Sequence, residues 1–334
     1  MFLRLFNQRG FIGVLLFAVA GILLWGESLL VPQPPPSFPG ESSMPFYAWL
    51  AALFQGETIW PRITAFGLII TNSLIISWLN TGFNFMPGKS WLPSLVYLLA
   101  VSAEPDLQTL HPAHLATLFI LLTVFFIFGT YNNRSNEVPW TFNASFSLAV
   151  ATLFYLPAIV LLPLIWISMF VLQKSDNWRV MVVPFWGFLA PWLLVAAGAF
   201  LTDNLVKWSD AIINDLFSVN NQYLFNVYFL ALTGLVVLLA AFGSIAVVAS
   251  GGVKKIMSRK FFVIFYWMVG LIMIAAIALR SAGPGIIALL SLPTTYFISY
   301  FFIFGKRNFW REALFMIYIA SMVASYFLMP ALRP

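Results

Sequence analysis

The sequence predicts an all-α, polytopic integral membrane protein with about eleven transmembrane helices, a cytoplasmic N-terminus and interfacial helices on the outer face. Of the 334 residues, 61% are hydrophobic and only 8% are charged, whereas about 25% of the residues of a soluble globular domain are charged. Many apolar runs reach about 20 residues, the length at which a helix crosses a hydrocarbon core of about 30 Å. A transmembrane barrel is excluded, because runs such as 261–279 lack the required alternation of polar and apolar residues.

The first apolar run, Phe11 to Leu30, follows Arg4 and Arg9. It is longer than the core of a typical signal peptide, so we expect a retained first helix. The predicted crossings are residues 11–30, 62–80, 90–103, 112–131, 141–156, 158–173, 179–201, 223–250, 261–279, 284–304 and 311–330. Pro157 lies inside the segment 141–173, which forms either one long kinked helix or two short ones.

The charged residues between these crossings sort by side. With the N-terminus inside, the inner loops hold 13 of the 17 Lys and Arg residues, and the outer side holds 8 of the 11 Asp and Glu residues. Cytoplasmic loops of membrane proteins are enriched in Lys and Arg. A single helix at 141–173 would move the basic clusters at 254–260 and 306–311 to the outside, so two short helices are preferred.

Three outer segments interrupt what we expect to be a single membrane domain, residues 1–334. The loop 31–59 begins with five prolines and continues into an aromatic stretch, 44–54, that predicts a short interfacial helix. The loop 102–112 contains two acids and a histidine. The segment 202–222 has apolar residues at helical spacing and predicts a second helix lying on the outer surface.

Composition also excludes several classes of function. The net charge of +6 comes mostly from the loop cations that orient the chain, so we expect no nucleic-acid partner. The absence of Cys excludes disulfides, thiolate metal sites and cysteine nucleophiles. The sequence also lacks a nucleophile elbow, a phosphate-binding Gly-rich loop and a His-Glu-x-x-His motif.

The outer acids are the first candidates for chemistry, because a carboxylate near the apolar boundary has a weakened hydration shell and can act as a general base. Glu41 is the leading candidate, since it lies between the proline-rich stretch and the predicted interfacial helix. Glu104 and Asp106 are candidate helpers, and Glu27 and Glu57 lie on the same side. The alternative is that these residues are ordinary solvated acids.

His111 and His114 are the only histidines of the chain. Their spacing places them on neighbouring positions of one helical turn, where with Glu104 or Asp106 they could bind a divalent cation such as zinc, manganese or magnesium. Two histidines form a weak metal signal, and the alternative is a helix start at headgroup level. No cofactor is otherwise indicated.

Two outer arginines are candidate ligands for a lipid phosphate. Arg280 precedes the turn 281–285, Ser-Ala-Gly-Pro-Gly, whose backbone amides could approach an anion. Arg62 begins the second helix near Glu57. Snorkelling of both arginines to ordinary phospholipid is the alternative interpretation.

The predicted membrane cores contain almost no charged residues. Their polar groups are residues such as Asn72, Ser73, Asn143 and Thr295, which are explained by hydrogen bonds between helices. Ion-coupled transporters usually place ionisable groups near the midplane. The pattern therefore argues against a proton-coupled pump.

The order of these features resembles the GT-C superfamily of polytopic glycosyltransferases. The resemblance lies in the acidic first outer loop, in Trp60–Gly67 at the second helix, in Ala103–Asp106, and in the small-residue helix Phe142–Pro157 that ends in a proline. It covers roughly the first 200 residues and concerns layout. The chain is also similar to uncharacterised bacterial multi-pass families, which imply no reaction.

The resemblance implies transfer of a sugar from a polyprenyl-phosphate donor at the outer face of a bacterial cytoplasmic membrane. By position it assigns the base to Glu41, or alternatively to Glu27, with Glu104 or Asp106 as helpers and Arg280 as a contact to lipid phosphate. The second hypothesis is a non-enzymatic membrane subunit of a secretion or envelope complex, with a membrane-protein partner. A transporter is the third.

Overall fold

The computed structural model confirms the all-helical fold class. It describes residues 11–30, 38, 41, 44–54, 58–84, 86, 90–132, 137–172, 178–217, 227–249, 256–279, 283–304 and 309–331, among which no β-strand occurs. The helices are α2 (Phe11–Leu30), α3 (Pro45–Ala52), α4 (Trp60–Phe83), α5 (Leu92–Ser102), α6 (Pro112–Asn132), α7 (Glu137–Phe154), α8 (Leu162–Leu172), α9 (Trp178–Leu201), α10 (Leu205–Phe217), α12 (Val227–Ala249), α13 (Ile256–Ala278), α14 (Gly285–Phe304) and α15 (Phe309–Ala331). Two 3₁₀ helices, η1 (Pro105–Gln108) and η3 (Leu156–Leu161), complete the described elements.

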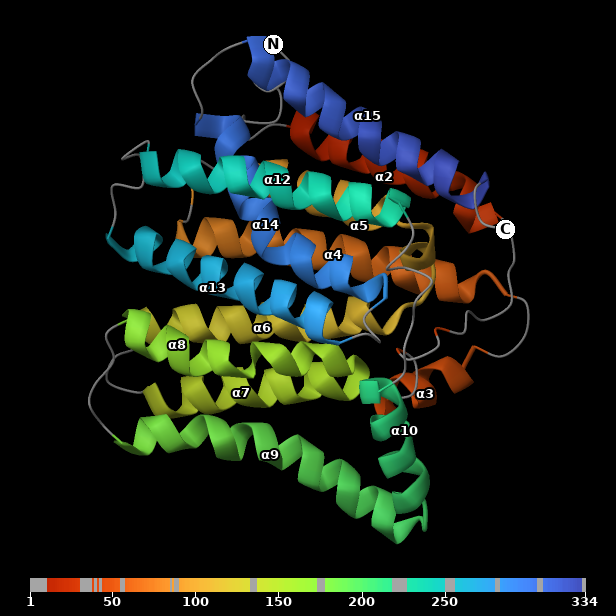
Figure 1. The fold of residues 1–334 in the computed structure, drawn as a ribbon, viewed down its shortest axis with the longest axis vertical. Coiled ribbons are helices and arrows are strands. Elements are labelled where there is room, and N and C mark those ends of the chain that lie inside the picture. Colours follow the sequence, from red (N-terminus) through yellow and green to blue (C-terminus); the bar gives the residue numbers. More distant parts are fainter. Residues whose placement is uncertain are drawn as a thin grey trace.

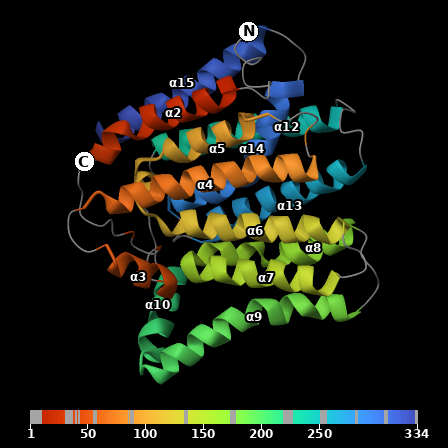
Figure 2. The ribbon, with the colours of Figure 1, turned by 180° about the vertical axis from the view of Figure 1, so that it is seen from behind.

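The long helices lie side by side with their axes roughly aligned (Figures 1 and 2). Helices α2 and α15 form one edge of the bundle and α9 forms the opposite edge, with α4, α5, α6 and α14 between them. Helices α3 and α10 run across the same end of the bundle. This is the end at which the candidate site is found.

Six of the described helices are long and apolar enough to cross a membrane: α4, α6, α9, α12, α13 and α14. Shorter apolar helical stretches occur at Gly13–Gly26, Leu92–Ser102 and Leu156–Leu172. Each predicted crossing coincides with a helix whose ends differ from the prediction by a few residues. The lengths and apolarity of the runs in the sequence therefore located the helices correctly.

Pro157 divides the segment 141–173, as the charge pattern predicts. Helix α7 ends at Phe154, and Tyr155 has an extended backbone (φ −141°, ψ 101°). Pro157, at the second position of η3, has no N–H to donate to a carbonyl one turn earlier, so it cannot continue α7. The chain restarts as η3 and continues directly into α8.

The interior is joined by hydroxyl groups that donate to backbone carbonyls of neighbouring helices. Thr295 of α14 donates to the carbonyl of Pro93 (2.7 Å), Tyr296 donates to that of Ile76 (3.0 Å), and Tyr318 of α15 donates to that of Val96 (3.1 Å). Because lipid is as apolar as a Leu side chain, membrane helices associate through such bonds and through close packing.

Glycines allow the closest of the helix contacts. A Cβ added at Gly129 of α6 would overlap the indole ring of Trp140 in α7, and one at Gly187 of α9 would overlap Ser145 of α7. A Cβ at Gly243 of α12 would overlap the backbone carbonyl of Phe297 in α14. Small residues let membrane helices approach one another in this way.

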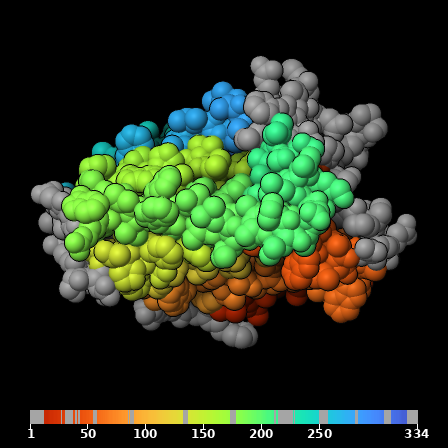
Figure 3. Space-filling model, turned by 90° about the horizontal axis from the view of Figure 1, so that it is seen from below, coloured from red at the N-terminus to blue at the C-terminus, as the bar shows by residue number. Residues whose placement is uncertain are grey.

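The two short helices predicted at the outer surface are present as α3 and α10. Helix α10 contacts the end of α9, where the rings of Trp192 and Trp208 lie 5.8 Å apart. In the space-filling view of the edge formed by α9, the surfaces of α9 and α10 run across the molecule (Figure 3). Trp49 of α3 and Val206 of α10 are both about 70% exposed, at 69% and 71%.

Candidate functional site

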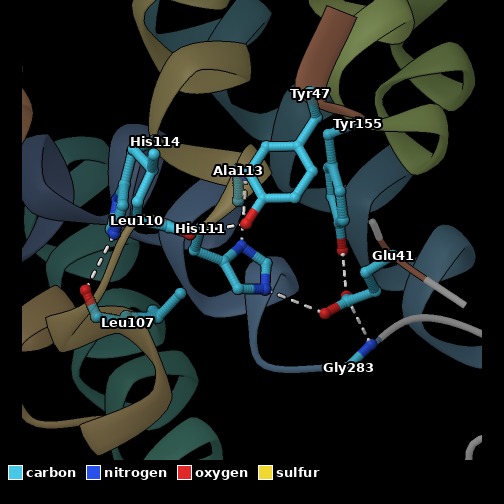
Figure 4. Close-up of polar contacts among 9 residues, drawn as sticks. All are labelled: Glu41, Tyr47, Leu107, Leu110, His111, Ala113, His114, Tyr155 and Gly283. Carbon is cyan, nitrogen blue, oxygen red and sulfur yellow. Dashed lines mark hydrogen bonds and ion pairs between the residues drawn. The ribbon is translucent and has the colours of Figure 1, made fainter. Parts of the chain in front are cut away.

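Glu41 lies at the centre of a cluster of polar contacts (Figure 4). Its carboxylate accepts hydrogen bonds from the Tyr155 hydroxyl (2.8 Å) and the Gly283 backbone N–H (2.7 Å), both at Oε1. Its Oε2 lies 2.9 Å from Nε2 of His111. We call Glu41, His111, Tyr155 and Gly283 the Glu41 cluster.

The four members come from segments far apart in the chain. Glu41 belongs to a turn in which its N–H donates to the carbonyl of Phe38 (3.0 Å). His111 directly precedes α6, Tyr155 directly follows α7, and Gly283 lies two residues before α14. One carboxylate therefore joins the first long loop to the ends of three helices.

The bonding pattern assigns the proton on His111. The N–H of Ala113 donates to Nδ1 (3.1 Å), so Nδ1 carries a lone pair. The proton of the neutral ring therefore lies on Nε2, which donates it to Glu41. Both ring nitrogens are engaged, so His111 orients the carboxylate and has no nitrogen left to act as a base or to ligate a metal.

Three dipolar donors thus stabilise the charge of Glu41, a group that is 1% exposed. A buried carboxylate without such partners would be very unfavourable. Oε1 accepts two bonds and Oε2 accepts one. Because a carboxylate oxygen can accept two bonds, one acceptor position on Oε2 stays open within the described contacts.

The glycines on either side of Pro284 let the backbone approach the cluster. A Cβ at Gly283 would lie 2.9 Å from Oε2 of Glu41, and one at Gly285 would lie 2.7 Å from Cε1 of His111 and 2.8 Å from the Tyr155 hydroxyl. The sequence marked this turn as a place where amides could meet an anion. In the structure, the anion that meets the Gly283 amide is Glu41.

His114 lies beside the cluster, with its ring centroid 6.2 Å from that of His111. Its Nε2 donates to the carbonyl of Leu107 (2.8 Å). Among the described residues, no group of three His, Cys, Asp or Glu residues could hold a metal ion. The divalent cation suggested for His111 and His114 therefore has no ligand set in this part of the chain.

Helix α3 is fastened to the same region by Tyr47. Its hydroxyl donates to the carbonyl of Leu110 (2.8 Å), immediately before His111. Burial of this ring raises the pKa of the Tyr47 hydroxyl above its ordinary value, so the group stays a donor. The bond ties the interfacial helix that follows Glu41 to the segment that carries His111.

Arg62 belongs to a second polar network. Its Nη1 donates to the carbonyl of Ser28, and the Ser28 hydroxyl donates to the side chain of Gln108. Gln108 in turn donates to the carbonyl of Ser102 (2.7 Å), whose hydroxyl accepts from the indole of Trp25 (2.8 Å). Arg62 thus joins the ends of α2, α4 and α5.

The other predicted residues are placed as follows. Glu104 is buried (1% exposed) and precedes η1, and Asp106 is half-buried in the first turn of η1. Glu57 and Arg280 lie outside the described residues, as does the side chain of Glu27. Sequence reasoning found Glu41 and His111 but missed Tyr155, whose only signal was its place before Pro157.

The fold and this cluster define a helical protein of membrane type with a buried carboxylate at one end of its bundle. Residues 89–332 match the model of the Family of unknown function (DUF6427), and the chain belongs to that family. No curated protein and no solved structure matches the chain. The matched region includes His111, Tyr155 and Gly283, whereas Glu41 precedes it.

Proposed function

We propose that the chain crosses a bacterial cytoplasmic membrane eleven times, with the N-terminus inside and the Glu41 cluster at the outer end. The excess of Lys and Arg in alternate loops supports this orientation. The chain has no Cys, so single cysteines can be introduced cleanly. A membrane-impermeant maleimide should label Ser209→Cys in intact cells and Lys254→Cys only after permeabilisation; the reverse pattern would overturn the orientation.

At this outer end we propose a GT-C-like transfer of a sugar from a polyprenyl-phosphate donor, with Glu41 as the base. One observation carries the proposal: the acid of the first loop, Glu41, contacts His111 of the second loop and Tyr155, which directly follows α7. These are three of the segments on which the resemblance to the superfamily depends. His111 and Tyr155 would hold the carboxylate ionised and oriented.

In this mechanism the open acceptor position on Oε2 takes the proton of an acceptor hydroxyl. The acceptor oxygen forms a bond to the anomeric carbon of the sugar while the bond from that carbon to the phosphate oxygen breaks, and the polyprenyl phosphate leaves with the bonding electrons. Oε2 lies close to the backbone of Gly283, because a Cβ added there would be 2.9 Å from Oε2. An acceptor therefore has to displace the turn or the His111 ring before Glu41 can act.

The closure of the site favours a second candidate, the non-enzymatic subunit of an envelope complex. Glu41 and Glu104 are each 1% exposed, and His111 is fully buried. A carboxylate whose three donors come from three other segments of the chain also serves as a structural junction. In this candidate Glu41 holds the outer end together, and a membrane-protein partner binds elsewhere on the chain.

Glu41→Gln separates the two candidates. The amide oxygen can still accept from Tyr155 and Gly283, but its N–H₂ then faces the Nε2–H of His111, so the variant loses one bond and keeps two. Asp210→Asn is the matched control, since Asp210 is an exposed acid at the same end of the bundle. Folding of both variants is checked by thermal melting in detergent.

The readout is the profile of lipid-linked sugars and surface glycans in cells that carry only the variant. A folded Glu41→Gln protein with a changed profile, beside a normal profile for Asp210→Asn, supports the transferase. A folded variant with an unchanged profile overturns it. Co-purification of a stoichiometric membrane partner from cells with either variant would support the subunit.

A further inference from the structure

Asn72 and His114 form a pair of fully buried polar residues next to the Glu41 cluster. Asn72 lies midway along α4 and His114 in the first turn of α6. Both are 0% exposed. The Nδ2 group of Asn72 donates to the backbone carbonyl of His114 (3.0 Å) and lies 3.5 Å from the hydroxyl of Tyr97.

The orientation of both side chains follows from these bonds. Turning the Asn72 amide over would place its oxygen against the His114 carbonyl, two acceptors facing each other, so Nδ2 faces that carbonyl and Oδ1 points away from it. The Nε2–H of His114 donates to the Leu107 carbonyl, which leaves Nδ1 with a lone pair. Asn72 Oδ1 and His114 Nδ1 are therefore both acceptors.

Neither acceptor receives a hydrogen bond from the described residues. A buried polar atom without a partner costs about 1–3 kcal/mol, and nearly all buried polar atoms in proteins have one. Each of these two acceptors is therefore a place for a group that donates a hydrogen bond, and the two lie on residues joined by the bond from Asn72 to the His114 backbone. An anion has no proton to offer, and an amide oxygen with a single nitrogen is a poor ligand set for a metal ion.

We infer that Asn72 Oδ1 and His114 Nδ1 bind ordered water inside the bundle. Water supplies two donors in the smallest volume, and buried waters characteristically satisfy such leftover groups. The site lies between α4, α5 and α6, since Tyr97 of α5 contacts Asn72. The water site does not depend on the proposed transferase activity.

The two histidines make the inference directly measurable. In full-length protein in lipid bilayers, labelled with ¹⁵N only at His and Lys, solid-state NMR gives four imidazole signals. Water-edited spectra should transfer magnetisation from water to Nδ1 of His114. They should not do so to Nδ1 of His111, because the Ala113 amide occupies that nitrogen.

The amino group of Lys207, exposed on α10, is the positive control for transfer from water. His114 can be identified without a mutation, because it is the only histidine followed by a leucine. In a sample labelled with ¹³C at the His carbonyl and ¹⁵N at Leu, the bonded ¹³C–¹⁵N pair occurs only between His114 and Leu115. Absence of transfer to His114 Nδ1, beside normal transfer to Lys207, overturns the inference. A cryo-EM map that resolves water should show density beside both acceptors, and empty density at both would likewise refute it.

Discussion

Helices α14 and α9 look alike in sequence and occupy opposite environments in the structure. Both are long, apolar and interrupted by proline, at Pro293 in α14 and at Pro184 and Pro191 in α9. In α14, 89% of the membrane-length stretch is buried inside the bundle, whereas in α9 only 22% is buried. Apolarity therefore does not decide which helix lies in the middle.

The two helices differ in hydroxylated residues: α14 contains four Ser and Thr residues and α9 contains none. Among the buried hydroxyls of α14, that of Thr295 donates to the Pro93 carbonyl of α5, while α9 exposes large side chains such as Trp186 (58%). Between helices in a bilayer no hydrophobic force favours burial, because lipid tails are equally apolar. A residue that forms a hydrogen bond or packs closely is stabilised by a neighbouring helix. A large apolar residue is about as stable when it faces lipid.

Each helix also has a close contact at a glycine with a neighbouring long helix, but the atoms that meet the glycine differ. Gly243 of α12 lies against the backbone of α14 at Phe297. Gly187 of α9 lies against the side chain of Ser145 in α7. A backbone carbonyl in the middle of a helix cannot move aside, while a serine hydroxyl can rotate. The contact between Gly243 and Phe297 should therefore tolerate a larger side chain less well than the contact between Gly187 and Ser145.

Gly243→Ala should have the largest effect of the substitutions considered. The new methyl group overlaps the Phe297 carbonyl and forces α12 away from α14, which should lower the free energy of unfolding by about 3 kcal/mol. Unfolding of the purified protein by titration with a denaturing detergent measures the change.

Gly234→Ala, on the same helix, is the matched control. A Cβ at Gly234 meets nothing within 4 Å, and alanine is the better helix former. This variant should be as stable as the parent or slightly more so. Equal losses at both positions would show that α12 does not pack against α14 in this register.

Gly187→Ala should cost less, about 1–2 kcal/mol. The methyl group overlaps the Ser145 hydroxyl, which can rotate, but it would also lie 2.8 Å from the backbone carbonyl of Phe142. Thermal melting followed by tryptophan fluorescence detects the loss. Gly198→Ala on the same helix, where a Cβ has no neighbour within 4 Å, should leave the melting temperature unchanged.

The comparison also shows what the sequence could predict. Helix positions depend on local length and apolarity, so α2 was predicted as 11–30 and lies at Phe11–Leu30, and Pro157 was correctly taken as a break. The places of α9 and α14 depend on which faces meet across the bundle. The hydroxylated residues of α14 favour a protein neighbour, but they do not show which helix faces them.

The same limit applies to the Glu41 cluster. Glu41 and His111 were predicted because an acid and a histidine beside apolar segments are unusual by themselves. Tyr155 and Gly283 are ordinary residues that acquire a role only through contact, and Glu41 and Gly283 are 242 positions apart. The sequence also suggested an outside anion for the 281–285 turn, because it could not show that the protein's own carboxylate lies there.

Thr295→Val tests whether hydroxyl bonds between helices hold α14 in the centre. Valine has the shape of threonine but cannot donate to the Pro93 carbonyl of α5, which is left without that bond. The expected loss is about 1 kcal/mol in the free energy of unfolding. Thr294→Val is the control, because Thr294 donates within its own helix, to Leu290, and its replacement should cost less.

The smallest effect is expected on the outer face of α9. Trp186 is 58% exposed, and in a bilayer this surface faces lipid if no other protein covers it. Trp186→Leu should therefore change the free energy of unfolding of the purified protein by no more than about 0.5 kcal/mol. Tyr296→Leu is the contrasting variant, since Tyr296 is fully buried in α14 and donates to Ile76.

Measured in cells, Trp186→Leu also discriminates between the two candidate functions. If α9 faces only lipid, the variant should accumulate to the level of the parent and keep the parent's lipid-linked sugar profile. If α9 is the binding face of a membrane subunit, the variant should melt normally when purified but lose its partner or its abundance in the membrane. That second result would assign the exposed residues of α9 to an interface and explain why so apolar a helix packs mainly against α7 among the described helices.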